Sequence, residues 1–169
     1  IWDDDDYLWI GTAGGGLNKY NKKNEVFTYY RYNVSDPTSI SSDFITTICR
    51  DTQGNIWIGS WNGGLNKMPQ EKIEDGKFVR YQYSPVDTTS LISDFVATIV
   101  EDKQGNLWIG TLGGLDRMDP VTGRFEHYTG RVGDKVVDQV GCLQFDQHNN
   151  LWVGTIPVSY THLRAHETV

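Results

Sequence analysis

A ten-residue motif occurs four times in this chain and limits its fold more than any other feature. Each copy starts with an aspartate turn and ends with an apolar residue, Trp, Ile or Val, Gly and a hydroxyl residue; the copies cover 3–12, 51–60, 102–111 and 146–155. The tryptophans fall at positions 9, 57, 108 and 152, so their spacings are 48, 51 and 44 residues. A propeller blade repeats every ~40–50 residues, whereas leucine-rich, ankyrin and tetratricopeptide repeats are shorter. The recurrence therefore predicts a β-propeller.

The residues between successive motifs supply the other strands of a blade. In the second unit, Phe44–Arg50 is rich in β-branched residues, 56–59 follows the aspartate turn, 65–68 follows a Gly-Gly turn, and 78–83 alternates as an outer strand. The fold class predicted is all-β: a partial β-propeller of four-stranded antiparallel blades, with about two complete blades and parts of two others. The expected blade parts are 1–33, 40–83, 91–129 and 138–155.

We expect the first part to hold the last three strands of a blade and the fourth part the first two strands of another. A closed propeller needs typically ~4–8 blades. The chain is therefore expected to be a fragment of a larger protein.

The C-terminal residues 156–169 depart from the repeat, because no Gly-Gly-Leu follows Thr155. Residues 158–168 resemble one reading frame of a sequencing adapter. We therefore interpret the tail as non-native and leave it out of the fold. His162 and His166 have a spacing found in metal sites, but without a third ligand they predict no metal site.

Two sets of residues recur in the motif and are predicted to be structural. A large apolar plate at equivalent positions is expected to pack between adjacent blades; these residues are Trp9, Trp57, Trp108 and Trp152. A carboxylate six residues before the Trp is expected to accept backbone N–H groups of its turn; these residues are Asp51, Asp102 and Asp146, with Asp3 in the first copy.

Composition excludes some classes of function. The net charge of −7 argues against a nucleic-acid partner, because nucleic acids bind basic patches.

Cys49 and Cys142 lie in apolar strand patterns and are interpreted as small buried residues. No serine-hydrolase or zinc-protease motif is present in the sequence. We therefore predict no catalytic residues, no metal and no cofactor.

Departures from the repeat indicate where a ligand binds. Trp61 replaces Ala13 and Leu112 in the loop between the second and third strands of a blade. By antiparallel geometry this loop opens on the same face as the loop before each first strand. That face would combine an indole and amide with carboxylates, a chemistry that holds sugars; the candidate ligand-binding residues are Trp61, Asn62, Asp43, Asp94 and Asp138. The alternative is an exposed loop indole with carboxylates that cap turns.

The motif resembles the two-component regulator propeller repeat. The match is carried by residues 51–67 and 102–117, by the Phe-x-x-Tyr segments that begin at Phe27, Phe78 and Phe125, and by the Ser-Ile and Ser-Leu pairs at 39–40 and 90–91. The resemblance implies the periplasmic sensor region of an inner-membrane hybrid two-component system of Bacteroidetes. It also implies oligosaccharide binding, further blades and sensor domains in the same chain, a homodimer, and phosphorelay signalling to a histidine kinase outside this chain.

Two other functions stay open at this point. Streptogramin-lyase-like propeller enzymes have a similar aspartate turn, but a shorter repeat and a catalytic histidine. A protein-interaction scaffold is the third possibility, because fold alone does not separate binding from scaffolding.

Overall fold

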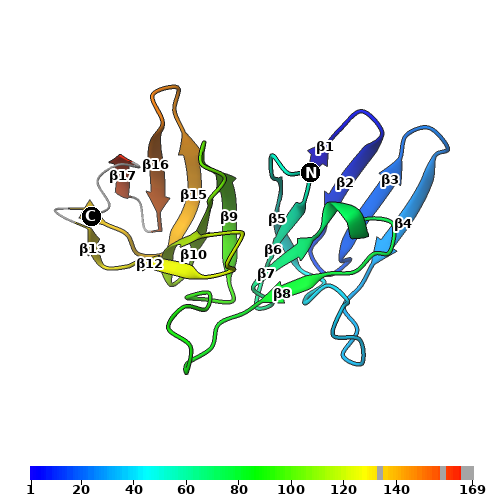
Figure 1. The fold of residues 1–169 in the computed structure, drawn as a ribbon, viewed down its shortest axis with the longest axis horizontal. Coiled ribbons are helices and arrows are strands. Elements are labelled where there is room, and N and C mark those ends of the chain that lie inside the picture. Colours follow the sequence, from blue (N-terminus) through cyan, green and yellow to red (C-terminus); the bar gives the residue numbers. More distant parts are fainter. Residues whose placement is uncertain (133–134, 157–158, 165–169) are drawn as a thin grey trace.

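The computed structural model describes residues 1–132, 135–156 and 159–164. In the described residues, four antiparallel sheets of three or four strands follow one another across the molecule in chain order, and a two-stranded sheet lies between the last two in sequence (Figure 1). The fold class predicted from the repeat, a partial β-propeller, is confirmed. Among the described segments no helix is long and apolar enough to cross a membrane.

The first two sheets each contain four strands in sequence order. Blade 1 consists of β1 (Trp2–Asp3), β2 (Tyr7–Gly11), β3 (Leu17–Asn21) and β4 (Val26–Tyr30). Blade 2 consists of β5 (Ile45–Arg50), β6 (Ile56–Ser60), β7 (Leu65–Met68) and β8 (Val79–Tyr81), with the short 3₁₀ helix η1 (Gln70–Lys72) before β8.

The remaining sheets repeat this arrangement. Blade 3 consists of β9 (Val96–Glu101), β10 (Leu107–Thr111), β11 (Gly114–Met118) and β12 (Phe125–Tyr128). A hairpin of β13 (Arg131–Val132) and β14 (Lys135–Val136) leads to blade 4, which consists of β15 (Val140–Phe145), β16 (Asn150–Thr155) and β17 (Ser159–Arg164).

Both partial blades contain one strand more than the sequence predicted. In blade 1, the short strand β1 pairs with β2, with Trp2 opposite Trp9. In blade 4, β17 pairs with β16 over six residues. Residues 159–164 thus occupy the place of a third strand, although the repeat pattern stops before them. Their origin as an adapter stays a prediction, and residues 157–158 and 165–169 lie outside the described residues.

The hydrophobic core lies between the sheets. Trp57 and Leu65 of blade 2 form one buried cluster with residues of blade 3, including Val96 and Ile109. Equivalent clusters join blade 1 to blade 2 around Trp9 and blade 3 to blade 4 around Trp108. Trp9, Trp57 and Trp108 are 1%, 0% and 2% exposed, whereas Trp152, which was predicted to pack between blades in the same way, is 46% exposed. Each sheet is therefore stabilised mainly by its neighbours.

The glycine of the Trp-Ile-Gly motif marks the closest approach of neighbouring sheets. A Cβ atom on Gly59 would lie 2.6 Å from both Thr47 Cγ2 in the same blade and Val96 Cγ1 in the next. Gly110 meets Thr98 and Val140 at the same distance. The repeat therefore needs glycine here because a side chain would push two blades apart.

The aspartate turns need a residue with positive φ. Gly54 and Gly105 have φ angles of 86° and 84°, and Asn149 has φ of 64° at the equivalent place in blade 4. Asparagine can replace glycine in this turn because it tolerates positive φ.

The prediction that both cysteines are buried is wrong for Cys142. Cys49 is partly buried, and burial raises the pKa of its thiol to about 11. Cys142 is exposed. It follows a register shift in the pairing of β15 with β16, and such a bulge interrupts the alternation of buried and exposed side chains from which burial was inferred.

Candidate functional site

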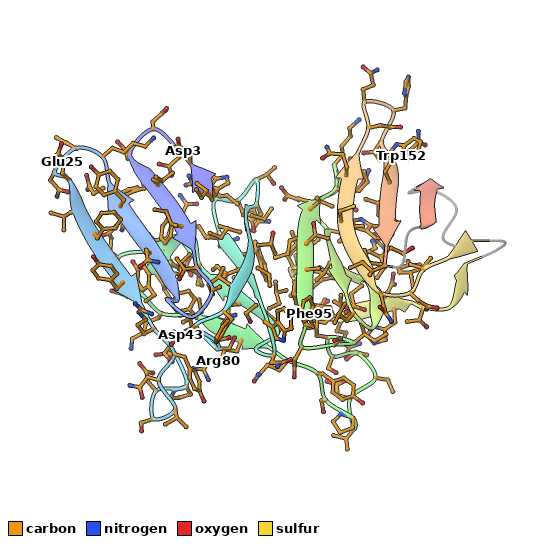
Figure 2. The ribbon with its side chains drawn as sticks, turned by 180° about the vertical axis from the view of Figure 1, so that it is seen from behind. Asp3, Glu25, Asp43, Arg80, Phe95 and Trp152 are labelled. Carbon is orange, nitrogen blue, oxygen red and sulfur yellow. The ribbon has the colours of Figure 1, made fainter. Side chains whose placement is uncertain are left out.

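The loops between second and third strands open at the same end of the blades as the loops before each first strand. Figure 2 shows Asp43, Arg80 and Phe95 at this end, and Asp3, Glu25 and Trp152 toward the other. Backbone hydrogen bonds join the two kinds of loop across blades: the N–H groups of Gly14 and Gly16 donate to the Asp43 carbonyl at 3.0 and 2.8 Å. We call this end the loop face.

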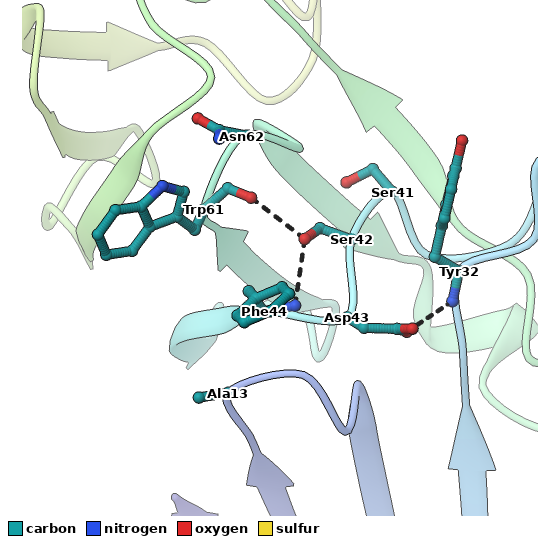
Figure 3. A pocket seen from close by; sticks show the side chains of 8 residues that line it. All are labelled: Ala13, Tyr32, Ser41, Ser42, Asp43, Phe44, Trp61 and Asn62. Atoms are coloured by element: carbon teal, nitrogen blue, oxygen red, sulfur yellow. Dashed lines mark hydrogen bonds between the residues drawn. The ribbon is translucent and has the colours of Figure 1, made fainter.

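A cavity of about 850 Å³ lies on the loop face where blade 1 meets blade 2 (Figure 3). Its lining combines aromatic rings, two serines, one amide and one carboxylate; the residues are Ala13, Tyr32, Ser41, Ser42, Asp43, Phe44, Trp61 and Asn62. Three of the five predicted ligand-binding residues therefore lie together. The other two, Asp94 and Asp138, do not line this cavity.

Trp61 is held from two sides. Its backbone N–H donates to the Phe44 carbonyl at 2.9 Å, and its indole makes an edge contact with Phe95 of blade 3, with ring centroids 4.5 Å apart. The residue is nevertheless 54% exposed. Asn62 follows it with φ of 61°, a conformation that asparagine tolerates in a tight turn. The loop thus holds an accessible aromatic plate at the cavity wall.

The three predicted aspartates share a structural role. Asp43 Oδ1 accepts the N–H of Tyr32 at 2.8 Å. Asp94 Oδ1 accepts the N–H of Tyr83, and Asp138 Oδ1 accepts that of Gly130, each also at 2.8 Å. Each carboxylate therefore ties the chain leaving an outer strand to the loop that begins the next blade. This is the capping arrangement that the sequence analysis left as the alternative for these residues.

Ser42 organises the cavity floor. Its hydroxyl donates to the Trp61 carbonyl and accepts the Phe44 N–H, both at 3.1 Å (Figure 3). Sequence reasoning missed Phe44, which is 53% exposed beside Trp61, and Tyr32 on the opposite side of the cavity. The available signal for Phe44 was its position directly after Asp43 in the loop.

The opposite end of each blade carries the aspartate turn. Asp51 Oδ1 accepts the N–H groups of Gln53 and Asn55 at 3.0 and 2.8 Å. Its Oδ2 accepts the side-chain amide of Asn55 and the Trp57 indole N–H, both at 2.7 Å. Carboxylate, turn and indole therefore form one buried unit.

The same unit recurs in blades 3 and 4. Indole N–H groups of Trp108 and Trp152 donate to Asp102 and Asp146, both at 3.0 Å. Trp152 is 46% exposed, unlike the other motif indoles. Hydrogen bonds from the side chain and backbone of Asn150 and from the Trp152 indole lower the pKa of the Asp146 carboxyl.

In blade 1 the turn differs from the prediction, which placed the capping carboxylate at Asp3. The Asp4 carboxylate accepts the N–H groups of Asp6 and Tyr7 instead, at 3.0 and 2.6 Å. The N–H of Asp4 bonds to the Tyr7 carbonyl, so the turn closes over fewer residues than at Asp51. Asp3 lies in β1 and pairs with Lys22.

A buried carboxylate and a histidine form a pair that sequence reasoning did not find. Asp116 is fully buried in β11, and its Oδ2 accepts the Ile92 N–H at 2.9 Å. Its Oδ1 lies 2.7 Å from His127 Nδ1, while His127 Nε2 lies 2.9 Å from the Thr88 carbonyl. Burial raises the pKa of the Asp116 carboxyl, opposed by these hydrogen bonds. In blade 2, Asn66 takes the place of Asp116 and accepts the Ser41 N–H.

Comparisons with known proteins define the class of the chain. The family described as two component regulator propeller matches residues 39–62 and 90–113. These segments span the loop before a first strand and the Trp-Ile-Gly motif of blades 2 and 3. Each of these two segments therefore matches a repeat of the two-component regulator propeller family. No curated protein matches it significantly.

Solved structures share the propeller fold of this chain. The extracellular domain of a hybrid two-component system of B. thetaiotaomicron superposes with a TM-score of 0.78 at 29% identity, over 95% of this chain and 21% of that one. A second such domain from the same organism gives 0.71 at 22% identity, over 99% of this chain and 22% of that one. This chain thus spans about a fifth of the length of these domains.

An enzyme shares the fold at greater distance. Streptogramin B lyase superposes with a TM-score of 0.61 at 14% identity, over 98% of this chain and 53% of the lyase. Likeness at this level extends to the propeller architecture alone.

Proposed function

We propose that the chain is a ligand-sensing segment of the periplasmic propeller region of a hybrid two-component sensor. It binds oligosaccharides in the cavity beside Trp61, and the parent protein, a homodimer in the inner membrane, passes the signal to its histidine kinase. The family repeats and the likeness to extracellular domains of hybrid two-component systems support the location and the sensor role. The single observation that carries the ligand class is the accessible indole beside a carboxylate in one cavity.

The chemistry of the cavity suits a sugar ring. The C–H face of a pyranose packs against an exposed indole such as Trp61, while hydroxyl groups donate to carboxylate and amide oxygens such as those of Asp43 and Asn62. A concave, mostly apolar site with a few fixed polar groups is the usual form of a small-ligand site. Asp94 and Asp138 then stabilise their own loops and do not contact this ligand.

We propose that this segment does not catalyse a reaction. His127 is bonded to Asp116 and Thr88 on the outer strand of blade 3, and His148 lies in the Asp146 turn at the other end of the blade. Neither histidine lines the cavity. An enzyme of the lyase type needs a catalytic histidine at its site, so the cavity is better suited to binding.

The test is the affinity of the protein for a panel of plant and host oligosaccharides, measured by calorimetry, with the variant Trp61→Ala. Loss of the indole should weaken binding of the recognised sugar by at least about tenfold, which corresponds to ~1.4 kcal/mol. Leu112→Ala is the matched control, because Leu112 occupies the equivalent loop position in blade 3 and is 41% exposed outside the cavity. Unchanged affinity of Trp61→Ala would remove the proposal.

A further inference from the structure

Among the described residues, Asp43 is the one charged residue that lines the cavity. Its Oδ1 accepts the Tyr32 N–H at 2.8 Å, and within the described residues its Oδ2 has no hydrogen-bond partner. Figure 3 shows the carboxylate beside the Tyr32 backbone, with the Trp61 indole across the cavity. A ligand seated against the indole therefore meets one carboxylate oxygen that still has room to accept a hydrogen bond.

Arg31 and Arg80 make hydrogen bonds to residues outside the cavity lining. Arg31 donates from Nη1 to the Gly14 carbonyl at 3.2 Å. Arg80 donates from Nε to the Ser39 carbonyl at 2.8 Å and from Nη2 to the Ser39 hydroxyl at 2.7 Å, with its guanidinium 5.6 Å from the centre of the Tyr32 ring. Neither arginine lines the cavity. Both guanidinium groups bond to uncharged acceptors on residues outside the lining.

The wider loop face adds charge of the same sign as Asp43. Asp94 and Asp138 stand at the equivalent position in the next two loops, and the chain as a whole has a net charge of −7. Like charges in a partly desolvated site repel strongly, and the repulsion weakens only as salt screens it. Among the described residues no cationic side chain lines the cavity, so an acidic group inside it would face Asp43 without a cation in the lining.

We propose that the oligosaccharide recognised in this cavity carries no acidic groups. This inference rests on the proposed function and narrows its ligand class. Hydroxyl groups of the sugar donate to Asp43 Oδ2, while a ring face covers Trp61. A uronate carboxylate or a sulfate at the same place cannot donate, and it adds a second negative charge beside Asp43.

The test compares oligosaccharides that differ only in their acidic groups. Suitable pairs are β-1,4-mannan with β-1,4-mannuronan, cello-oligosaccharides with β-1,4-glucuronan, and carboxyl-reduced with native oligogalacturonides, all of equal chain length. Affinities are measured by calorimetry on the whole chain, with Asp43→Asn, Trp61→Ala and Leu112→Ala as variants. The neutral member of at least one pair should bind at least about tenfold more tightly than its acidic partner. High salt should reduce this difference in affinity between the neutral and the acidic member.

Asp43→Asn should also reduce the difference in affinity, because an uncharged side chain no longer repels the acidic member. The asparagine oxygen can still accept the Tyr32 N–H, so the loop should keep its conformation. Leu112→Ala should leave the difference in affinity unchanged. Preferential binding of an acidic member, lost in Trp61→Ala, would overturn this inference and keep the proposed function. A difference in affinity that persists unaltered in Asp43→Asn would also overturn it. If no member of any pair binds, the proposed function falls and this inference falls with it.

Discussion

The buried hydrogen-bonded unit of Asp51 and Trp57 allows the repeat to be tested energetically. Asp51→Ala removes the acceptor of four hydrogen bonds. The Trp57 side chain is 0% exposed and Asn55 is 6% exposed, so water does not readily replace the carboxylate. Each buried donor left without a partner costs about 1–3 kcal/mol. Two such donors, the indole N–H and the Asn55 backbone N–H, give an expected loss of about 2–6 kcal/mol.

Urea unfolding followed by far-ultraviolet circular dichroism measures this loss directly. For a chain of this length, the melting temperature should fall by roughly 10 °C as well, at ~2–4 °C for each kcal/mol. The matched control is Asp146→Ala, because Asp146 makes the same bonds to Asn150 and Trp152. Since Trp152 is 46% exposed, solvent can take over its N–H there, and the loss should be clearly smaller.

Equal destabilisation by the two substitutions would refute the reasoning. It would mean that burial of the indole N–H does not set the cost, and that the aspartate acts only through its own turn. A near-zero effect of Asp51→Ala would show that the unit is a consequence of blade packing and does not stabilise it.

Two further predictions concern packing and pH. Gly59→Ala should destabilise the protein by about 1–3 kcal/mol in urea unfolding, because its Cβ would overlap β-branched side chains of two blades. Gly141→Ala should cost less, since its nearest neighbour is the end of the Ile156 side chain at 3.1 Å; the reverse order would contradict the packing argument. Asp116→Asn tests the raised pKa of a buried carboxyl: protonation favours the folded state, so wild-type stability is lost as pH rises from the ordinary value of 3.8 through the raised one. The unfolding free energy of the wild type relative to this variant should therefore decrease as the pH rises above 3.8, and a constant difference would show that the carboxyl is not perturbed.

The fold was predictable because the repeated residues determine how neighbouring sheets pack. An indole at the same place in each unit requires a partner sheet, and the fixed order of turn, strand and glycine leaves little choice of architecture. The start of blade 1 was less predictable. In the run Asp3–Asp6 any of four carboxylates can cap a turn, and only the pairing of Trp2 with Trp9 selects Asp4.

The candidate site was predictable in part. Trp61, Asn62 and Asp43 were found because they belong to loops that antiparallel topology places at one end. Tyr32 comes from the end of the preceding blade, so its presence depends on how two blades sit together, which no local pattern encodes. The Asp116–His127 pair was not predicted, because nothing in the motif indicates that β11 and β12 place these residues opposite one another.

The contrast in exposure between Trp61 and the indoles inside the core has an optical consequence. Trp9, Trp57 and Trp108 are sealed between sheets, whereas Trp61 stands at the mouth of the cavity. Collisional quenchers such as iodide or acrylamide reach a surface indole and not a sealed one. Trp2 is partly buried and Trp152 is exposed. In a background where both are replaced by phenylalanine, the quenchable emission comes largely from Trp61, and its protection from the quencher reports whether the cavity wall is covered.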